Sequence, residues 1–286
     1  MKRLIFAAAA AFAALSAASP ASAQGGCTRE QLDEVAQSWV NALEKGSMFE
    51  MTLGEWVDYR ENLKLGTLSA ILDKPRHVDH SMKLLDTTTC QVFIETIMTD
   101  PEHPYVMATQ IARSGFAGGV GVISNIVTDE GDWLFSAANT LKFAKGENWG
   151  VIPEGQRNTR AELIAAANAY LDLFMDKNTQ VPWGTPCARL EGGAYTGKGL
   201  PTDSCNVGVP SGIKMVERTY VVDETIGAVD VFLKMGDNAR PDSHLFRIEN
   251  GKIRYVHTTT NCGTQVNCGF PPFDPNKPLG PSQAGN

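Results

Sequence analysis

The sequence lacks the motifs of several common enzyme classes. It has no Gly-x-Ser-x-Gly motif, which argues against a serine hydrolase, and its paired glycines do not have the spacing of a phosphate-binding loop. No Cys-x-x-Cys pair occurs, so the usual ligand spacing of a structural zinc site is missing. The formal charge is −7, whereas proteins that bind nucleic acid need a basic face. We therefore expect no metal, no cofactor and no nucleic-acid partner.

A long apolar run is also missing from the chain after its first residues. Met1-Lys2-Arg3 precedes an apolar stretch that ends near Ala18, and the small-x-small site Ala21-Ser22-Ala23 follows. A basic start, a short apolar segment and such a site form a secretory signal peptide. We predict a signal peptide over residues 1–23 and a mature chain that begins at Gln24. We expect this chain to be periplasmic or extracellular, without membrane insertion; an uncleaved membrane anchor is the alternative.

All six cysteines lie in the predicted mature chain. An even number of cysteines in an exported chain favours disulfides over free thiols, and this argues against a cysteine nucleophile. The spacing does not determine the pairing. We expect two pairs that stay within their halves, Cys27–Cys90 and Cys187–Cys205, and a third pair, Cys262–Cys268, that closes a small loop.

The chain divides into two halves of similar pattern. Residues 146–157 are rich in Gly, Pro and polar residues, which is typical of a linker. Each half opens with apolar residues at helical spacing, over 32–43 and over 163–174. The first run stops at Gly46, and a capping box of Thr159 and Glu162 precedes the second. We predict a first unit over 27–150, a second over 157–268 and a Pro-rich tail over 269–286.

After its helix, each half has a polar element and then several strand-like runs. We expect polar loops at Tyr59-Arg60-Glu61 and around Arg189 and Glu191. The runs that follow alternate or are apolar, as strands do. They cover 92–98, 105–111 and 121–128 in the first half, and 219–223, 228–235, 245–249 and 252–259 in the second. The order predicts an α+β fold with two tandem units, each an antiparallel sheet with helices, and a homodimer is compatible with it.

Three segments of the second half, together with the order of elements, resemble the SnoaL-like family, also called the nuclear transport factor 2-like fold. The segments are Val181-Pro182-Trp183, Cys187 to Gly193, and Pro241-Asp242-Ser243-His244. The resemblance implies a cone-shaped unit in which a curved sheet wraps around helices and encloses a pocket. This fold includes enzymes, binding proteins and transport factors, so it does not by itself imply an activity.

The segment from His244 to His257 carries the most informative chemistry. Asn250-Gly251 lies between two alternating runs, which predicts a two-residue hairpin turn. That register places His244 opposite His257, on one face with Phe246 and Tyr255. Opposed imidazoles resist double protonation, so one is expected to act as a base inside the pocket. The alternative is two polar residues at the rim of the sheet.

Other candidates have a functional and a structural interpretation. Asp242 orients a histidine or shapes a turn, and Tyr195 is a proton donor or a packing residue. Arg189 and Glu191 share a face and form either a substrate anchor or a structural ion pair. Trp183 lines the pocket or packs a loop onto the core.

These residues lead to a first hypothesis, a cofactor-independent lyase, dehydratase or isomerase that acts on a small aromatic or sugar-derived substrate. His257 or His244 is the base, Asp242 orients it, Tyr195 or Tyr255 is the acid, and Arg189 binds the substrate. The alternatives are a binding protein that stacks its ligand on Trp183, Phe246 and Tyr255, and a structural protein of the cell envelope.

Overall fold

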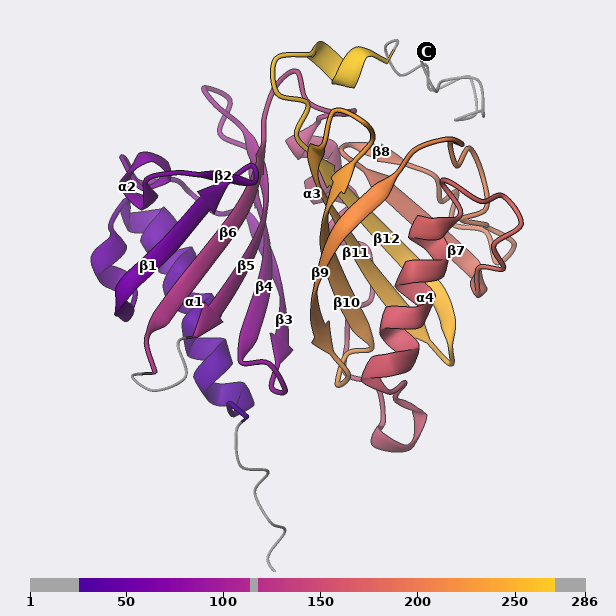
Figure 1. The fold of residues 1–286 in the computed structure, drawn as a ribbon, viewed down its shortest axis with the longest axis horizontal. Helices are drawn as coiled ribbons and strands as arrows, with labels where there is room; N and C mark the ends of the chain where they lie inside the picture. Colours follow the sequence, from indigo (N-terminus) through magenta and orange to yellow (C-terminus); the bar gives the residue numbers. More distant parts are fainter. Residues whose placement is uncertain (1–25, 114–117, 271–286) are drawn as a thin grey trace, which may run out of the picture.

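The structure is a computed structural model that describes residues 26–113 and 118–270. The predicted signal peptide, the predicted start at Gln24 and nearly all of the predicted tail lie outside these residues. Two six-stranded mixed sheets and a few helices form an α+β fold of two units (Figure 1). In the described ranges, no helix is long and apolar enough to cross a membrane.

The first unit begins with α1 (Arg29–Lys45), which starts at a capping box of Thr28 and Gln31 and ends at Gly46. The remaining elements are η1 (Met48–Glu50), β1 (Leu53–Glu61), β2 (Lys64–Leu65), α2 (Leu68–Ile71), β3 (His80–Asp86), β4 (Gln91–Met98), β5 (Tyr105–Arg113) and β6 (Val120–Thr128). The strand order in the sheet is β2-β1-β6-β5-β4-β3, with β1 parallel to β6 and the other neighbours antiparallel.

The second unit repeats this arrangement strand for strand. Its helix α4 (Arg160–Asp172) starts at the predicted capping box of Thr159 and Glu162. The order β8-β7-β12-β11-β10-β9 again has one parallel pair, β7 with β12. The elements are α3 (Ala137–Ala144), η2 (Glu154–Gln156), β7 (Trp183–Glu191), β8 (Ala194–Tyr195), β9 (Met215–Asp223), β10 (Ala228–Met235), β11 (Arg240–Glu249), β12 (Lys252–Thr260) and η3 (Val266–Gly269).

Each sheet has two faces with different neighbours. One face packs against the helix of its own unit, around Trp39 of α1 or Tyr170 of α4, and we call it the helix face. The opposite faces of the two sheets are turned toward each other (Figure 1). They pack through apolar side chains such as Phe93, Phe232 and Leu245. We call these the inter-sheet faces. Because side chains alternate along a strand, neighbouring residues belong to different faces.

Two reciprocal ion pairs tie the units together. Arg29, at the start of α1, donates from both terminal nitrogens to Asp223 at the end of β9, at 2.7 and 2.9 Å. Arg160, at the matching place on α4, donates to Asp86 at the end of β3, at 2.7 Å. Each carboxylate also accepts a backbone N–H from the other unit, Asp223 from Leu85 and Asp86 from Val222. The two units are therefore related by an approximate two-fold arrangement.

Replacing either carboxylate is expected to destabilise the protein by a similar amount. Both Asp86 and Asp223 are 1% exposed, and their arginine partners can regain water, so Asp86→Asn and Asp223→Asn should each cost about 2–3 kcal/mol. Denaturant unfolding measures this loss. Asp237→Asn is the control, because the Lys214–Asp237 pair is exposed and should contribute less than about 1 kcal/mol. A loss no larger than the control's would contradict the proposed contribution of these pairs.

The predicted polar loops are wrong. Tyr59-Arg60-Glu61 ends β1, and Arg189 and Glu191 lie in β7. Gly184 and Pro186 make β7 difficult to predict from the sequence, because both residue types ordinarily mark loops or strand edges. The strand β3 was also not expected from the pattern of its residues.

The three predicted disulfides are confirmed: Cys27–Cys90, Cys187–Cys205 and Cys262–Cys268. Their sequence separations are 63, 18 and 6. A loop-closure estimate therefore gives stabilisations of roughly 4, 3 and 2 kcal/mol. Three disulfides fit a secreted or extracellular protein.

Candidate functional site

The β11–β12 hairpin departs from its predicted register after the first two pairs next to the turn. Asn250 and Gly251 have φ angles of 51° and 70°, and the pairs Glu249–Lys252 and Ile248–Ile253 are those expected. Arg254 is then an extra residue on β12, so that Arg247 pairs with Tyr255. This β-bulge shifts every later pair by one residue.

The shift overturns the predicted histidine pair. His244 lies opposite Thr258, and His257 lies opposite Leu245. Since a slip of one residue moves a side chain to the other face, the imidazoles occupy opposite faces of the sheet. His244 is on the helix face, with its ring centroid 5.6 Å from that of Tyr170. His257 is on the inter-sheet face.

A small cavity of about 40 Å³ lies on the helix face of the second unit. Its walls are mainly aromatic and apolar, and four polar side chains from three neighbouring strands reach it. It is lined by Trp133, Phe174, Glu191, Pro210, Ile213, Met215, Met235, His244, Thr258, Thr260 and Phe270. A mostly apolar hollow with a few convergent polar groups is typical of a small-molecule site.

His244 and Asp242 form a buried dyad at this cavity. Nδ1 of His244 lies 2.7 Å from Oδ2 of Asp242, and the side chains are 2% and 0% exposed. The contact has the distance of an ion pair but not the alignment of a hydrogen bond. The other carboxylate oxygen accepts the hydroxyl of Thr260. Asp242 thus faces one ring nitrogen, while Nε2 has no hydrogen-bond partner among the described residues.

Three polar side chains form a row across the strands at the cavity. Thr258 of β12 pairs with Glu191 of β7 on one side and with His244 of β11 on the other. Neighbouring strands are about 4.8 Å apart, so the backbones of Glu191 and His244 lie roughly 10 Å apart across the sheet. The hydroxyl of Thr258 is buried and has no hydrogen-bond partner in the described part of the chain. It is therefore available to a bound molecule.

Each guanidinium nitrogen of Arg189 contacts another group of the protein. Its Nε lies 3.1 Å from Oε1 of Glu191, Nη1 donates to the Tyr170 hydroxyl at 3.3 Å, and Nη2 donates to the carbonyl of Val207. Burial opposes its charge, but Glu191 and Tyr170 raise the pKa of Arg189 above its ordinary value. Burial also raises the pKa of Tyr170. These contacts favour the structural interpretation, in which Arg189 positions Glu191.

The first unit has a different row at the matching positions. Its strand register aligns Glu61, Asn125 and Thr109 with the three residues of the second unit. Thr109 donates to Asn125 at 2.9 Å, and Tyr59 donates to Glu61 at 2.7 Å. These polar groups bond to one another and include no histidine. The chemistry is therefore concentrated in the second unit.

On the inter-sheet face, His257 is held between two carboxylates. Nδ1 lies 3.0 Å from Oε1 of Glu95 on β4, and Nε2 lies 2.6 Å from Oε2 of Glu147. Burial lowers the pKa of His257, but the two carboxylates outweigh it and raise this pKa to about 10. With both nitrogens engaged and the ring charged, His257 has no free nitrogen to accept a proton. The prediction that it is a base therefore conflicts with this geometry.

The other predicted site residues are divided between the two faces. Tyr195 donates to Glu147 at 3.0 Å, and Tyr255 packs near Trp149 on the inter-sheet side, with ring centroids 5.8 Å apart. Phe246 is fully buried in the helix-face core, and Trp183 contacts Tyr170 there, with ring centroids 5.6 Å apart. Neither tyrosine lies on the face that carries His244, so the predicted acid and base are not brought together.

Three important residues were not predicted: Thr258, Glu95 and Glu147. Thr258 reaches the cavity only because of the bulge. Glu95 precedes His257 by 162 positions, and no local pattern links the two residues.

Comparison with known proteins gives a family match to the second unit. No curated protein and no solved structure matches the chain. Residues 156–260, from the end of η2 to the end of β12, match a family model described as a domain of unknown function, DUF8021.

Proposed function

We propose that this protein is an exported, cofactor-independent acid–base enzyme, most simply a lyase, with its reaction centre at the helix-face cavity of the second unit. One observation carries the proposal. A histidine at the cavity has a buried carboxylate 2.7 Å from one nitrogen, and its other nitrogen has no hydrogen-bond partner within residues 26–113 and 118–270. A carboxylate–imidazole dyad in a hollow is the arrangement of a general base.

In the proposed reaction, Nε2 of His244 removes a proton from a carbon next to an activating group. Asp242 stabilises the resulting imidazolium. The carbon–oxygen bond at the neighbouring carbon then breaks, and the electrons of the former C–H bond form the double bond. The Thr258 hydroxyl donates to the departing oxygen, which receives the proton back from His244, while Glu191 can accept a hydrogen bond from a substrate hydroxyl. A single residue serves as base and acid because Tyr195 and Tyr255 lie on the other face of the sheet.

We also propose that each unit is a SnoaL-like cone and that the protein works in the periplasm or outside the cell. The helix followed by a sheet of repeated strand order, and the helix-face position of the cavity, support the first part. The disulfides support the second.

A substrate screen tests the proposed function. The purified mature protein is incubated with lignin-type aromatic dimers and sugar-derived oligomers, and a new double bond is followed by ultraviolet absorbance. We expect a rise in absorbance with at least one substrate, and none after heat inactivation. A set of ligands that bind at the cavity without any turnover would instead support a binding protein and contradict the lyase.

A further inference from the structure

The helix-face cavity is too small to hold a whole substrate. Its volume is about 40 Å³, whereas ligand pockets commonly measure roughly 300–1,000 Å³ and one water occupies about 30 Å³ of liquid. Only the reacting end of a molecule fits beside His244. The rest of the substrate must lie in a neighbouring hollow.

A groove of about 470 Å³ adjoins the cavity. It lies between the loop before α3, the β7–β8 turn and the C-terminal loop, and Phe270 lines both hollows. Trp133 of the cavity wall meets Phe270 edge to face, with ring centroids 4.7 Å apart. We call this the lid groove; it is lined by Gly131, Asp132, Leu134, Phe135, Ser136, Asn139, Gly193, Ala194, Val266, Asn267 and Phe270.

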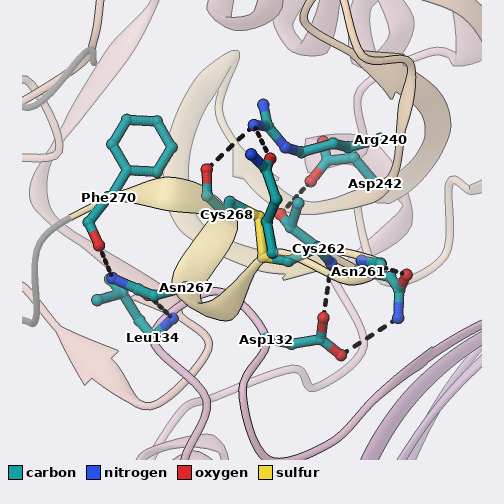
Figure 2. Close-up of a disulfide and its surroundings, with 12 residues drawn as sticks. Asp132, Leu134, Arg240, Asp242, Asn261, Cys262, Asn267, Cys268 and Phe270 are labelled. Carbon is teal, nitrogen blue, oxygen red and sulfur yellow. Dashed lines mark hydrogen bonds between the residues drawn. A yellow bond between two sulfur atoms is a disulfide. The ribbon is translucent and has the colours of Figure 1, made fainter.

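The loop closed by the Cys262–Cys268 disulfide is shown in Figure 2. It contributes Val266 and Asn267 to the lining of the lid groove. Asn267 accepts the backbone N–H of Leu134 at 2.9 Å and bonds through its own N–H to the carbonyl of Gly131 at 2.6 Å. Arg240 donates to the carbonyl of Cys268 at 3.0 Å. The loop is therefore held by the segment before α3 on one side and by β11 on the other. These contacts place Phe270, which follows the loop, between the groove and the cavity.

The lining of the lid groove carries no cation among its residues. Its one acid, Asp132, is already bonded to the N–H groups of Cys262 and Asp129, at 2.6 and 3.1 Å. Burial disfavours the charged form of Asp132 and so raises its pKa. Among the residues that the structure describes, a carboxylate ligand would find no counter-charge in this groove, and an unpaired charge is costly to desolvate.

The remaining lining is uncharged: it combines apolar side chains with the polar side chains of Ser136, Asn139 and Asn267. Leu134, Phe135, Val266 and Phe270 supply apolar surface, and Asn139 offers a donor and an acceptor. We propose that the lid groove binds the uncharged aromatic part of the substrate, while the reacting end passes Phe270 to reach His244. This inference rests on the proposed function and selects neutral aromatic substrates over sugar acids.

A matched pair of probes tests the inference. One is an aromatic ether dimer with a primary alcohol, and the other is the same dimer oxidised to the carboxylic acid at that carbon. Binding to the full mature protein is measured by calorimetry. We expect the alcohol to bind at least about tenfold more tightly, because the acid must desolvate its charge without a partner.

Two lysine variants locate the effect. Val266 is 78% exposed at the groove, and Val216, on β9, is 44% exposed away from it. Val266→Lys should reduce the preference for the alcohol by about fivefold or more, since it supplies the missing cation, and Val216→Lys should leave the preference unchanged.

Tighter binding of the acid by the wild type, absence of binding by both probes, or an equal effect of both lysines would overturn the inference. These results are distinct from failure of the proposed function. Turnover of acids with no preference for alcohols would contradict only the proposed binding role of the lid groove. Binding in the groove without turnover of any substrate would contradict the proposed lyase activity.

Discussion

His257→Asn is expected to lower the free energy of unfolding by about 3–5 kcal/mol near neutral pH. The charged imidazole lies between Glu95 and Glu147, and all three side chains are at most 3% exposed. Removing it leaves two buried carboxylates without their cation. Glu95 belongs to the first sheet and His257 to the second, so the loss directly weakens the contact between units. Urea unfolding of both proteins measures it.

His103→Asn is the matched control. Nε2 of His103 lies 3.0 Å from Asp129, but the two side chains are 48% and 43% exposed. An exposed pair of this kind contributes about 0–1 kcal/mol. If the two variants lost the same stability, the buried triad would not hold the units together.

The same group gives the stability a definite dependence on pH. The pKa of His257 is raised to about 10 in the folded protein, from about 6.5 unfolded. The contribution of His257 to stability is complete below about pH 6.5 and is lost as the pH rises toward 10.

A second buried group acts in the same direction. Burial raises the pKa of Asp230 to about 8. Because the folded state keeps a proton that the unfolded state releases near pH 4, stability also falls between about pH 4 and 8. Alkaline pH should therefore lower the melting temperature, and a flat profile would contradict this.

His244→Asn is expected to reduce turnover by about 10²–10⁴-fold without unfolding the protein. Asparagine cannot accept and return the proton in the proposed reaction. Asp242→Asn should also reduce turnover, because the imidazolium then loses its buried counter-charge. Initial rates with the substrate found by screening measure both effects, and circular dichroism verifies the fold.

The matching position of the first unit provides the control for turnover. Thr109→Val removes the hydroxyl that donates to Asn125, and it should leave the rate unchanged because the first unit carries no equivalent dyad. If Tyr195→Phe abolished turnover while His244→Asn did not, the reaction centre would lie on the inter-sheet side instead.

The parts of the fold that depend on short-range signals were predictable. The capping box of Thr159, the stop at Gly46 and the turn at Asn250-Gly251 each depend on residues a few positions apart, and the structure contains all three. The disulfide pairs also followed the division into halves. The helix ends and the turn need no knowledge of the tertiary structure, whereas the cysteine spacing alone did not determine the disulfide pairs.

The site required information that local patterns do not hold. Arg254 reads as an ordinary strand residue, yet the bulge there places Thr258 rather than His257 opposite His244. The choice of face is then settled by packing, since Tyr170 lies on one side and Glu95 on the other. The second carboxylate at His257, Glu147, comes from the segment between the units, where the pattern predicts only a linker.

The different roles of the two histidines can be tested by nitrogen-15 NMR of the histidine side chains. At a pH between about 6.5 and the pKa of about 10 for His257, we expect a buried imidazole with protons on both nitrogens. Its signal should persist in His244→Asn and be lost in His257→Asn. Absence of a doubly protonated imidazole in the wild type, or loss of its signal in His244→Asn alone, would contradict the assignment of His257 to structure and His244 to proton transfer.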